Sequence, residues 1–396
     1  MKLRRRQLLM AGLTTGAAIA GGKKYLDLKT QRDIQARLLN LANQRDMDQV
    51  LQATLNADAM QTQEFKRIIE SVKLTSPTQP YDRQISKLLI RCSRIATEQY
   101  LKGKTIPNYK GDITSLPSYH SSLQGYTQIA NFIALEQTVT EEIPLQVLAQ
   151  VEQNQLEQEQ IDPIETNFNT IQSAVQLTTK ELVKIEKKVP VYFGFVLSSP
   201  QAQVMIFRGT QRTTEWLLNL TALQIDTKID INGDKTPQFS GRVHRGFVNI
   251  YQDLVTQTRE IAQKLDPTKP CYISGHSLGA AIATLAAMDL AITLPQIRPQ
   301  LRLYTYASPR IGDPTFANAH SQLIPNHYRI VNLADLVPLI PSTVFFNNIN
   351  YVHTGQEWSF LSQNGDLLPN HVVDTYRVAV EKNLETNKPR VYPVSG

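Results

Sequence analysis

Apolar and polar residues follow two different patterns along the chain, and the change between them lies near residue 189. Before it, apolar positions recur every three or four residues, as in helices with one buried face. After it, short continuous apolar runs alternate with helical patterns, which is typical of parallel strands joined by helices. The pattern therefore predicts a helical region over residues 25–188 and an α/β domain with a mostly parallel central sheet over residues 189–396.

The helical region divides into several segments. Helical spacing relates Ile34, Leu38 and Leu41, then Phe65, Ile68, Ile69 and Val72, and later Ile164, Phe168, Ile171, Val175 and Leu182. Serine and proline at 76–80 interrupt the pattern, and a helix over 84–102 is expected to follow. The stretch 103–125 contains Gly, Pro, Ser and Tyr and predicts a loop. Another helix is expected in the Gln- and Glu-rich stretch 136–188.

The strands of the second region are predicted from its apolar runs, at 191–198, 203–207, 271–274, 301–306 and 328–332. Ser199 and Pro200 connect the first two runs as in a hairpin. Helical patterns at 247–265 and 280–294 separate the later strands.

Residues 1–24 have the three parts of an export signal: basic residues, an apolar stretch too short to span a bilayer comfortably, and the cleavage site Ala18-Ile19-Ala20. Arg5-Arg6-Gln7-Leu8-Leu9 resembles a twin-arginine signal, although Arg4 and Leu8 depart from the usual residues. A general secretory signal and an uncleaved anchor are the alternatives. We therefore expect export to a periplasm, a lumen or the medium, with membrane association as a further option.

Composition and charge change this picture little. The formal net charge is +6, and four of these charges lie among residues 2–6. The remaining net charge of +2 gives no indication of nucleic-acid binding. The two cysteines, Cys92 and Cys271, do not suggest a disulfide scaffold, and Cys271 is expected to be a small buried residue. The sequence has no calcium loop or zinc-binding spacing, and it implies no protein partner.

One stretch combines a sharp turn with a nucleophile. Gly275-His276-Ser277-Leu278-Gly279 lies between a predicted strand and a run of small residues that predicts a helix. G-x-S-x-G in this context is the nucleophile elbow of α/β-hydrolases. Glycine at 275 and 279 removes Cβ atoms that would collide with neighbouring backbone in so tight a turn. Ser277 is then expected at the carboxyl end of the sheet, where the first N–H groups of the helix favour a developing negative charge.

A serine nucleophile needs a base and an orienting acid, and in α/β-hydrolases they follow in the order serine, acid, histidine. Asp335 comes just beyond the predicted strand 328–332 and is the preferred acid. Asp313 is the alternative, although its Gly-Asp-Pro turn is explained more simply by bonds to its own backbone. His371, where a loop enters the last helix, is preferred as the base to His353, which lies in a strand-like run.

The oxyanion of an acyl-transfer reaction needs backbone donors, and two positions offer them. Leu278 N–H directly follows the nucleophile. Thr210 ends the motif Phe207-Arg208-Gly209-Thr210 after a predicted strand, where glycine allows a close backbone approach. We interpret Arg208 as a structural ion-pair residue and not as a clamp for a substrate anion.

Several motifs in series resemble the class 3 lipase family, the fungal-lipase-like branch of α/β-hydrolases, over residues 189–376. They are Phe207-Arg208-Gly209-Thr210, Trp216 with Asn219-Leu220, Val243-His244-Arg245-Gly246-Phe247 with Tyr251, the elbow, Ala307-Ser308-Pro309-Arg310-Ile311-Gly312-Asp313, the Asp335 segment, Tyr351-Val352-His353-Thr354-Gly355 and His371. The sequence departs from the family at Ala307, where glycine is usual. The resemblance says little about residues 25–100 and 136–188.

The resemblance implies the α/β-hydrolase fold, a triad of Ser277, Asp335 and His371, and an oxyanion hole formed at Thr210 and Leu278. It implies structural roles for His244 and His353. It also implies a short amphipathic lid over residues 213–223, with Trp216, Leu217 and Leu220, which would cover the serine in water and face a lipid surface. A permanent core position for Trp216 and Leu220 is an equal alternative.

We therefore expect a serine ester hydrolase that acts on acylglycerols or other lipid esters at a membrane or lipid surface. The reaction would pass through an acyl-enzyme and needs no metal ion or cofactor, because serine and histidine suffice for it. A phospholipase or galactolipase of the same fold is an alternative. A non-catalytic lipid-binding protein that has kept the fold is another, because fold alone does not guarantee activity.

Overall fold

The computed structural model describes residues 63–144, 182–209, 224–226, 240–341, 343–345, 349–363 and 367–387. The chain divides into two compact units, residues 1–133 together with 192–396, and residues 134–191. The predicted export signal and the helices expected at 34–41 and 164–181 lie outside the described residues. No helix in the described ranges combines the length and the apolar composition that crossing a bilayer requires.

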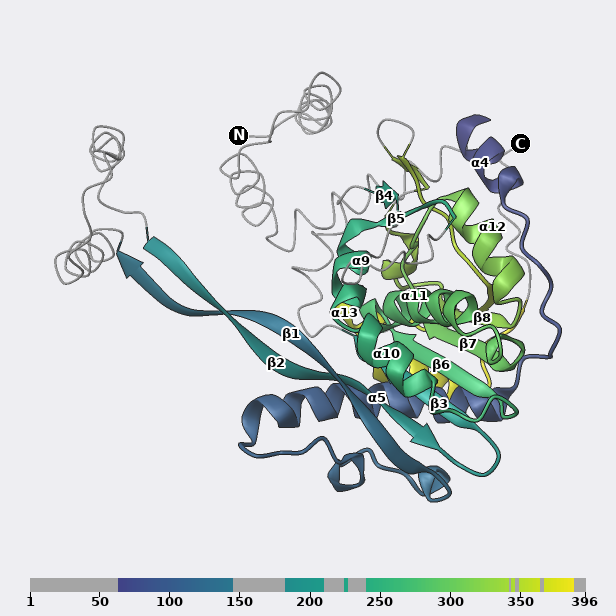
Figure 1. Cartoon of the computed structure of the whole chain (residues 1–396). Coiled ribbons are helices and arrows are strands. Elements are labelled where there is room, and N and C mark those ends of the chain that lie inside the picture. The colour runs from purple at the N-terminus through teal and green to yellow at the C-terminus, as the bar shows by residue number, and fades with distance from the viewer. Residues whose placement is uncertain are drawn as a thin grey trace, which may run out of the picture. The chain divides into compact units, whose positions relative to one another are not determined.

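The centre of the fold is a seven-stranded sheet with the order β1-β2-β3-β6-β7-β8-β11 (Figure 1). Its strands are β1 (Thr127–Pro144), β2 (Leu182–Ser198), β3 (Gln203–Phe207), β6 (Cys271–His276), β7 (Leu301–Tyr306), β8 (His327–Asn332) and β11 (Gln356–Phe360). From β3 to β11 every neighbouring pair is parallel, while β2 is antiparallel to β3. The mostly parallel sheet predicted from the apolar runs is therefore confirmed, as is the hairpin at Ser199 and Pro200.

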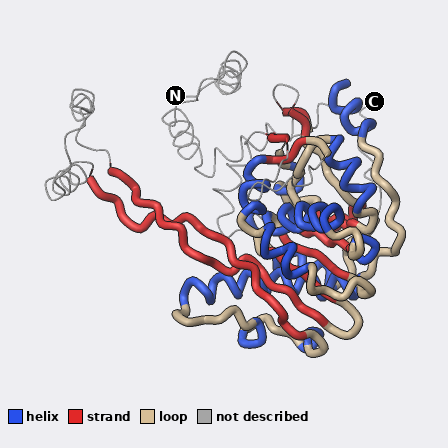
Figure 2. Tube along the Cα trace, viewed as in Figure 1, coloured by secondary structure: helices blue, strands red, loops and turns tan. Residues whose placement is uncertain are grey.

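Short strands complete the β structure. β4 (Gln224–Asp226) pairs with β5 (Arg242–His244), and β9 (Val344–Phe345) pairs with β10 (Ile349–Asn350). The tube in Figure 2 shows how the long strands β1 and β2 contrast with these short ones.

Helices cover both faces of the parallel part of the sheet. α11 (Leu278–Thr293) packs on β3, β6 and β7, and α9 (Arg245–Gln252), α10 (Val255–Ala262) and α12 (Pro314–Leu323) adjoin it. α5 (Arg83–Thr105) packs with α14 (Val373–Glu381) in a second core that includes Ile206, Tyr306 and Ile330. α4 (Gln63–Ser71) contacts α12, and α13 (Leu367–His371) precedes α14.

α5 shows why this segment is a helix. Asp82 caps its first turn by accepting from the N–H groups of Gln84 and Ile85. Its buried apolar positions follow at three- and four-residue spacing and form one face: Leu88, Leu89, Cys92, Ile95, Ala96 and Tyr100 are among them. The helix expected over 84–102 is confirmed, and it packs directly on the sheet although it lies within the region predicted as a helical amino-terminal part.

Three expectations about secondary structure were wrong in detail. Residues 136–144 and 182–188 lie in the strands β1 and β2, not in helices, although the composition there is rich in Gln and Glu, because β1 and β2 are neighbours in the sheet and strand pairing outweighs local propensity. The helix expected over 247–265 is two helices that break at residues 253–254. The run 351–355 has only an isolated bridge, at Val352, and the next strand is β11. The domain boundary near residue 189 stays a prediction.

Candidate active site

The turn between β6 and α11 holds Ser277 in a conformation that few residues adopt. Its backbone has φ 60° and ψ −125°, and its N–H donates to the carbonyl oxygen of Tyr306 at 2.9 Å. A methyl group at 275 would lie 2.2 Å from the carbonyl oxygen of Gly279, and one at 279 would lie 2.2 Å from that of Phe207. The two glycines are thus required for the strand and the helix to approach so closely, as the sequence predicted.

The structure brings Ser277, His371 and Asp335 into one hydrogen-bonded series. Ser277 Oγ lies 2.8 Å from His371 Nε2, and His371 Nδ1 lies 2.8 Å from Asp335 Oδ2. All three residues are buried. They come from the end of β6, the turn after β8 and the end of α13, so residues far apart in sequence meet at the carboxyl edge of the sheet.

Hydrogen bonds to both carboxylate oxygens fix the orientation of the Asp335 side chain. Its Oδ1 accepts from the N–H of Val337 at 3.0 Å, and its Oδ2 accepts from the hydroxyl of Tyr376 at 2.7 Å as well as from His371. Tyr376 lies on α14 and accepts in turn from the N–H of Asn332 at 3.0 Å. The carboxylate therefore presents one defined oxygen to the imidazole.

Asn332, the last residue of β8, connects the segments that carry the acid and the base. Its Nδ2 donates to the carbonyl oxygens of Ser362 at 2.9 Å and Asn370 at 3.0 Å. Its Oδ1 accepts from the N–H of Ser362 at 2.9 Å. Sequence reasoning missed both Asn332 and Tyr376, and the only available signal was their closeness in the chain to Asp335 and His371.

His276, the residue before the nucleophile, lies against the base. Its ring centroid is 4.9 Å from that of His371, and its Nε2 has no hydrogen-bond partner among the described residues. Burial, together with the neighbouring His371, holds the pKa of His276 well below its usual range. A neutral ring at this place adds no positive charge beside the imidazole of His371.

The two alternatives for acid and base have structural positions. Asp313 Oδ1 accepts from the N–H of Phe316 at 2.8 Å and caps α12, which is the backbone bonding expected for it. Burial raises the pKa of Asp313. His353 Nε2 lies 2.7 Å from the carbonyl oxygen of Pro338. His244 caps α9 through its Nδ1, which accepts from the N–H of Gly246.

The expected oxyanion donors are described only in part. Leu278 is the first residue of α11, so its N–H has no acceptor within the helix. Gly209 approaches the elbow closely, since a methyl group there would lie 2.8 Å from the carbonyl oxygen of His276. Thr210 and the expected lid residues Trp216, Leu217 and Leu220 lie outside the described residues.

Arg208 lies directly after β3, where it contacts aromatic rings and backbone carbonyl oxygens, and the expected ion pair stays a prediction. Its guanidinium lies 3.7 Å from the ring centroid of Tyr100 and 4.9 Å from that of Phe193. Its side chain donates to the carbonyl oxygens of Tyr192 and Gly209. Arg208 thereby attaches the end of β3 to α5.

Within the described ranges, no group of three or more His, Cys, Asp or Glu residues could hold a metal ion. Cys92 and Cys271 are free and buried, and burial raises the pKa of each thiol to about 12. Cys271 is thus the small buried strand residue that the sequence predicted.

Residues 204–345 match the family model described as Lipase (class 3). A lipase from Rhizomucor miehei is 36% identical over 162 residues, which are 39% of this chain and 40% of that protein. A chloroplastic phospholipase A(1) from Arabidopsis thaliana is 34% identical over 158 residues, 36% of this chain and 34% of that protein. A secreted mono- and diacylglycerol lipase from Fusarium solani is 31% identical over 160 residues, 39% of this chain and 43% of that protein.

The chain thus spans less than half the length of these curated relatives. The range matched by the family model, residues 204–345, contains the elbow and Asp335 and ends before His371.

Proposed function

We propose that this chain, whose residues 204–345 match the class 3 lipase family model, is a serine hydrolase of lipid carboxylic esters. The observation that supports the proposal most is the buried series Ser277–His371–Asp335, with 2.8 Å at each step. A purely structural role explains neither the strained backbone of Ser277 nor the pairing of its hydroxyl with an imidazole.

In the proposed reaction Ser277 Oγ attacks the acyl carbonyl carbon while His371 Nε2 accepts the serine proton. Asp335 accepts from Nδ1–H, which keeps Nε2 as the basic nitrogen and stabilises the imidazolium. His371 then protonates the leaving alkoxide, and an acyl-enzyme on Ser277 remains. Water attacks this ester with His371 again as base, His371 then returns the proton to Ser277 Oγ as the acyl–oxygen bond breaks, and the free acid leaves.

The developing oxyanion is proposed to accept from the N–H of Leu278 and from Thr210. Two such donors matter, because loss of one oxyanion donor typically costs on the order of 100- to 1,000-fold in kcat. We propose that residues 213–223, with Trp216, Leu217 and Leu220, form the lid over this site.

The relatives support two head-group classes. One is named lipase, one mono- and diacylglycerol lipase, and one phospholipase A(1). We propose acylglycerols as the substrates, presented at a membrane or lipid surface, with phospholipids or galactolipids as the alternative. Export through a twin-arginine-like signal at residues 1–24 is part of the proposal, and one relative is named as secreted.

Hydrolysis of a soluble p-nitrophenyl ester by the purified chain tests the chemistry. The Ser277→Ala variant should lose on the order of 10⁴-fold or more in kcat. Ser274→Ala is the matched control, because Ser274 is buried in the same strand and its Oγ lacks a hydrogen-bond partner among the described residues. Equal activity of wild type and Ser277→Ala, or inactivity of the wild type on all chain lengths, would overturn the proposal. Mass spectrometry of the lipids consumed then identifies the head group.

A further inference from the structure

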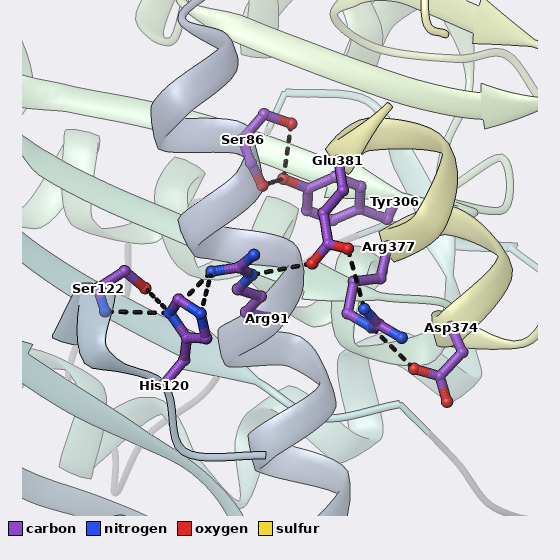
Figure 3. A network of polar contacts seen from close by, with 8 residues as sticks. All are labelled: Ser86, Arg91, His120, Ser122, Tyr306, Asp374, Arg377 and Glu381. Atoms are coloured by element: carbon purple, nitrogen blue, oxygen red, sulfur yellow. Dashed lines mark hydrogen bonds and ion pairs between the residues drawn. The ribbon is translucent and has the colours of Figure 1, made fainter. Parts of the chain in front are cut away.

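Helix α5 lies outside the matched residues 204–345, yet it contacts both halves of the candidate site. It packs on β3, β6 and β7, and it also packs along α14. β6 and β7 carry the elbow and its support, and α14 carries Tyr376. Besides its apolar packing, α5 makes polar contacts on each of these two sides, as Figure 3 shows.

The first contact leads to the nucleophile. The hydroxyl of Tyr306 donates to the carbonyl oxygen of Ser86 at 2.7 Å and lies 3.0 Å from Ser86 Oγ, and all these groups are buried. The carbonyl oxygen of the same Tyr306 accepts the N–H of Ser277. One residue at the end of β7 therefore binds α5 with its side chain and the elbow with its backbone.

The second contact leads to the acid. Arg91 Nε lies 2.9 Å from Glu381 Oε1, and Arg94 lies 3.3 Å from Asp374 Oδ2. On α14, Arg377 binds both of these carboxylates at 3.0 Å. The ion pairs clamp the first and last turns of the helix that places Tyr376 on Asp335.

His120 supports Arg91 from its other side. Its ring nitrogens lie 2.8 and 3.1 Å from Arg91 Nη1, and its Nδ1 accepts from the N–H of Ser122 at 3.1 Å (Figure 3). The guanidinium is thus held between a loop and α14. Restricting a long side chain in this way lowers the entropic cost of its ion pair.

We propose that α5 is a positioning element of the active site: through Tyr306 and through the Arg91–Glu381 pair it fixes the distance from Ser277 to the His371–Asp335 pair. The inference rests on the proposed hydrolase function. Ser86, Arg91 and Tyr306 touch no reacting atom, so they are positioning residues. Small changes in this distance matter, because a displacement of about 1 Å can cost on the order of 100-fold in rate.

The test compares kcat and KM on a soluble p-nitrophenyl ester. Tyr306→Phe removes only the hydroxyl that binds Ser86, and Arg91→Ala removes the pair with Glu381. Each should lower kcat threefold to tenfold with KM within twofold of wild type, and the double variant should lose more than either. Arg91→Lys should restore part of the lost kcat, because its ammonium can still pair with Glu381 but does not reproduce the fork that also contacts His120.

Arg83→Ala is the matched control. Arg83 also lies on α5 and pairs at 2.6 Å with a carboxylate near the carboxyl terminus, the buried Glu385, which lies beyond α14. Its loss should lower the melting temperature at least as much as Arg91→Ala, with kcat within twofold of wild type. If Arg91→Ala and Tyr306→Phe lower only the melting temperature, or if Arg83→Ala lowers kcat as they do, α5 is merely structural. Inactivity of the wild type, or failure of a serine-directed phosphonate to label Ser277, would instead refute the hydrolase proposal itself.

Discussion

At the scale of residues, the candidate site depends on two glycines that lack a Cβ atom as well as on the side chains that form hydrogen bonds. Ser277 reaches its position because positions 275 and 279 have no Cβ to meet the backbone around them. The carboxylate of Asp335 is oriented by Val337, Tyr376 and His371, so its geometry is over-determined. Strain at the nucleophile persists because these surroundings hold it there.

Tyr376→Phe tests the orientation of the acid. The change removes the donor to Asp335 Oδ2 and the acceptor for the N–H of Asn332, both buried. We expect a loss of about 1–3 kcal/mol in the free energy of unfolding, since a buried N–H is left unpaired. We also expect kcat to fall about fivefold or more with KM unchanged. Wild-type kcat in this variant would show that Val337 and His371 suffice to hold the carboxylate.

Ala307→Gly is expected to stabilise the protein. Ala307 has φ 51°, a region that favours glycine. Relief of this strain raises the free energy of unfolding, while the greater freedom of glycine in the unfolded chain lowers it. We expect a net gain of about 0.5–1 kcal/mol. Urea denaturation measures the change. A clear destabilisation would mean that the methyl group, which is fully buried, contributes more by packing than its backbone costs.

At the scale of elements, apolar pattern and end signals decide most of what forms. β3, β6, β7 and β8 are buried along almost their whole length, as expected of strands that are covered on both faces. β1 and β2 differ, because their residues include many that favour helices and yet form strands. Pairing with neighbouring strands outweighed local propensity.

The cap of α5 is open to a direct test. The side chain of Asp82 accepts from the N–H groups of Gln84 and Ile85 at 2.8 and 3.1 Å. Asp82→Ala should lower the free energy of unfolding by about 1 kcal/mol, whereas Asp82→Asn should keep most of the stability because its amide oxygen still accepts. Chemical denaturation of the three proteins gives the comparison. Equal losses in the two variants would point to the charge of Asp82 and not to the cap.

At the scale of the whole molecule, the fold buries three histidines in neutral form. His276, His320 and His327 are all buried, and burial lowers the pKa of each, that of His320 to about 3. The rings of His320 and His327 lie 5.2 Å apart, so two positive charges there would also repel each other. Lowering the pH should therefore destabilise the folded state relative to the unfolded chain.

The sign of the pH dependence follows from these shifts. In the unfolded chain a histidine binds its proton below a pKa of about 6.5, while folded His320 stays neutral down to about 3. The unfolded state then binds more protons, so stability falls as the pH falls through this window. Between pH 7 and pH 5 we expect His320 alone to cost up to about 2 kcal/mol. Unfolding curves of wild type and His320→Leu at both pH values should diverge accordingly, and parallel losses would contradict this.

The sequence alone determined β3, β6, β7, β8 and the second half of β2, together with the elbow, α5, and the choice of Ser277, Asp335 and His371 as the candidate triad. It could do so because strand periodicity, glycine at a sharp turn and the chain order of nucleophile, acid and base are all local or ordered along the chain. The class 3 lipase resemblance was likewise carried by consecutive motifs, and residues 204–345 match the model of that family.

Only the tertiary structure decided which residues support the site. Tyr376, Asn332, Tyr306 and Arg91 are ordinary residues in sequence, and each gains its position from a partner far along the chain: Tyr376 lies 41 residues from Asp335, and Tyr306 lies 220 residues from Ser86. Hydrogen bonds between distant segments depend on how the sheet and its covering helices pack. No local pattern encodes that packing, because it arises only when the whole core is buried together.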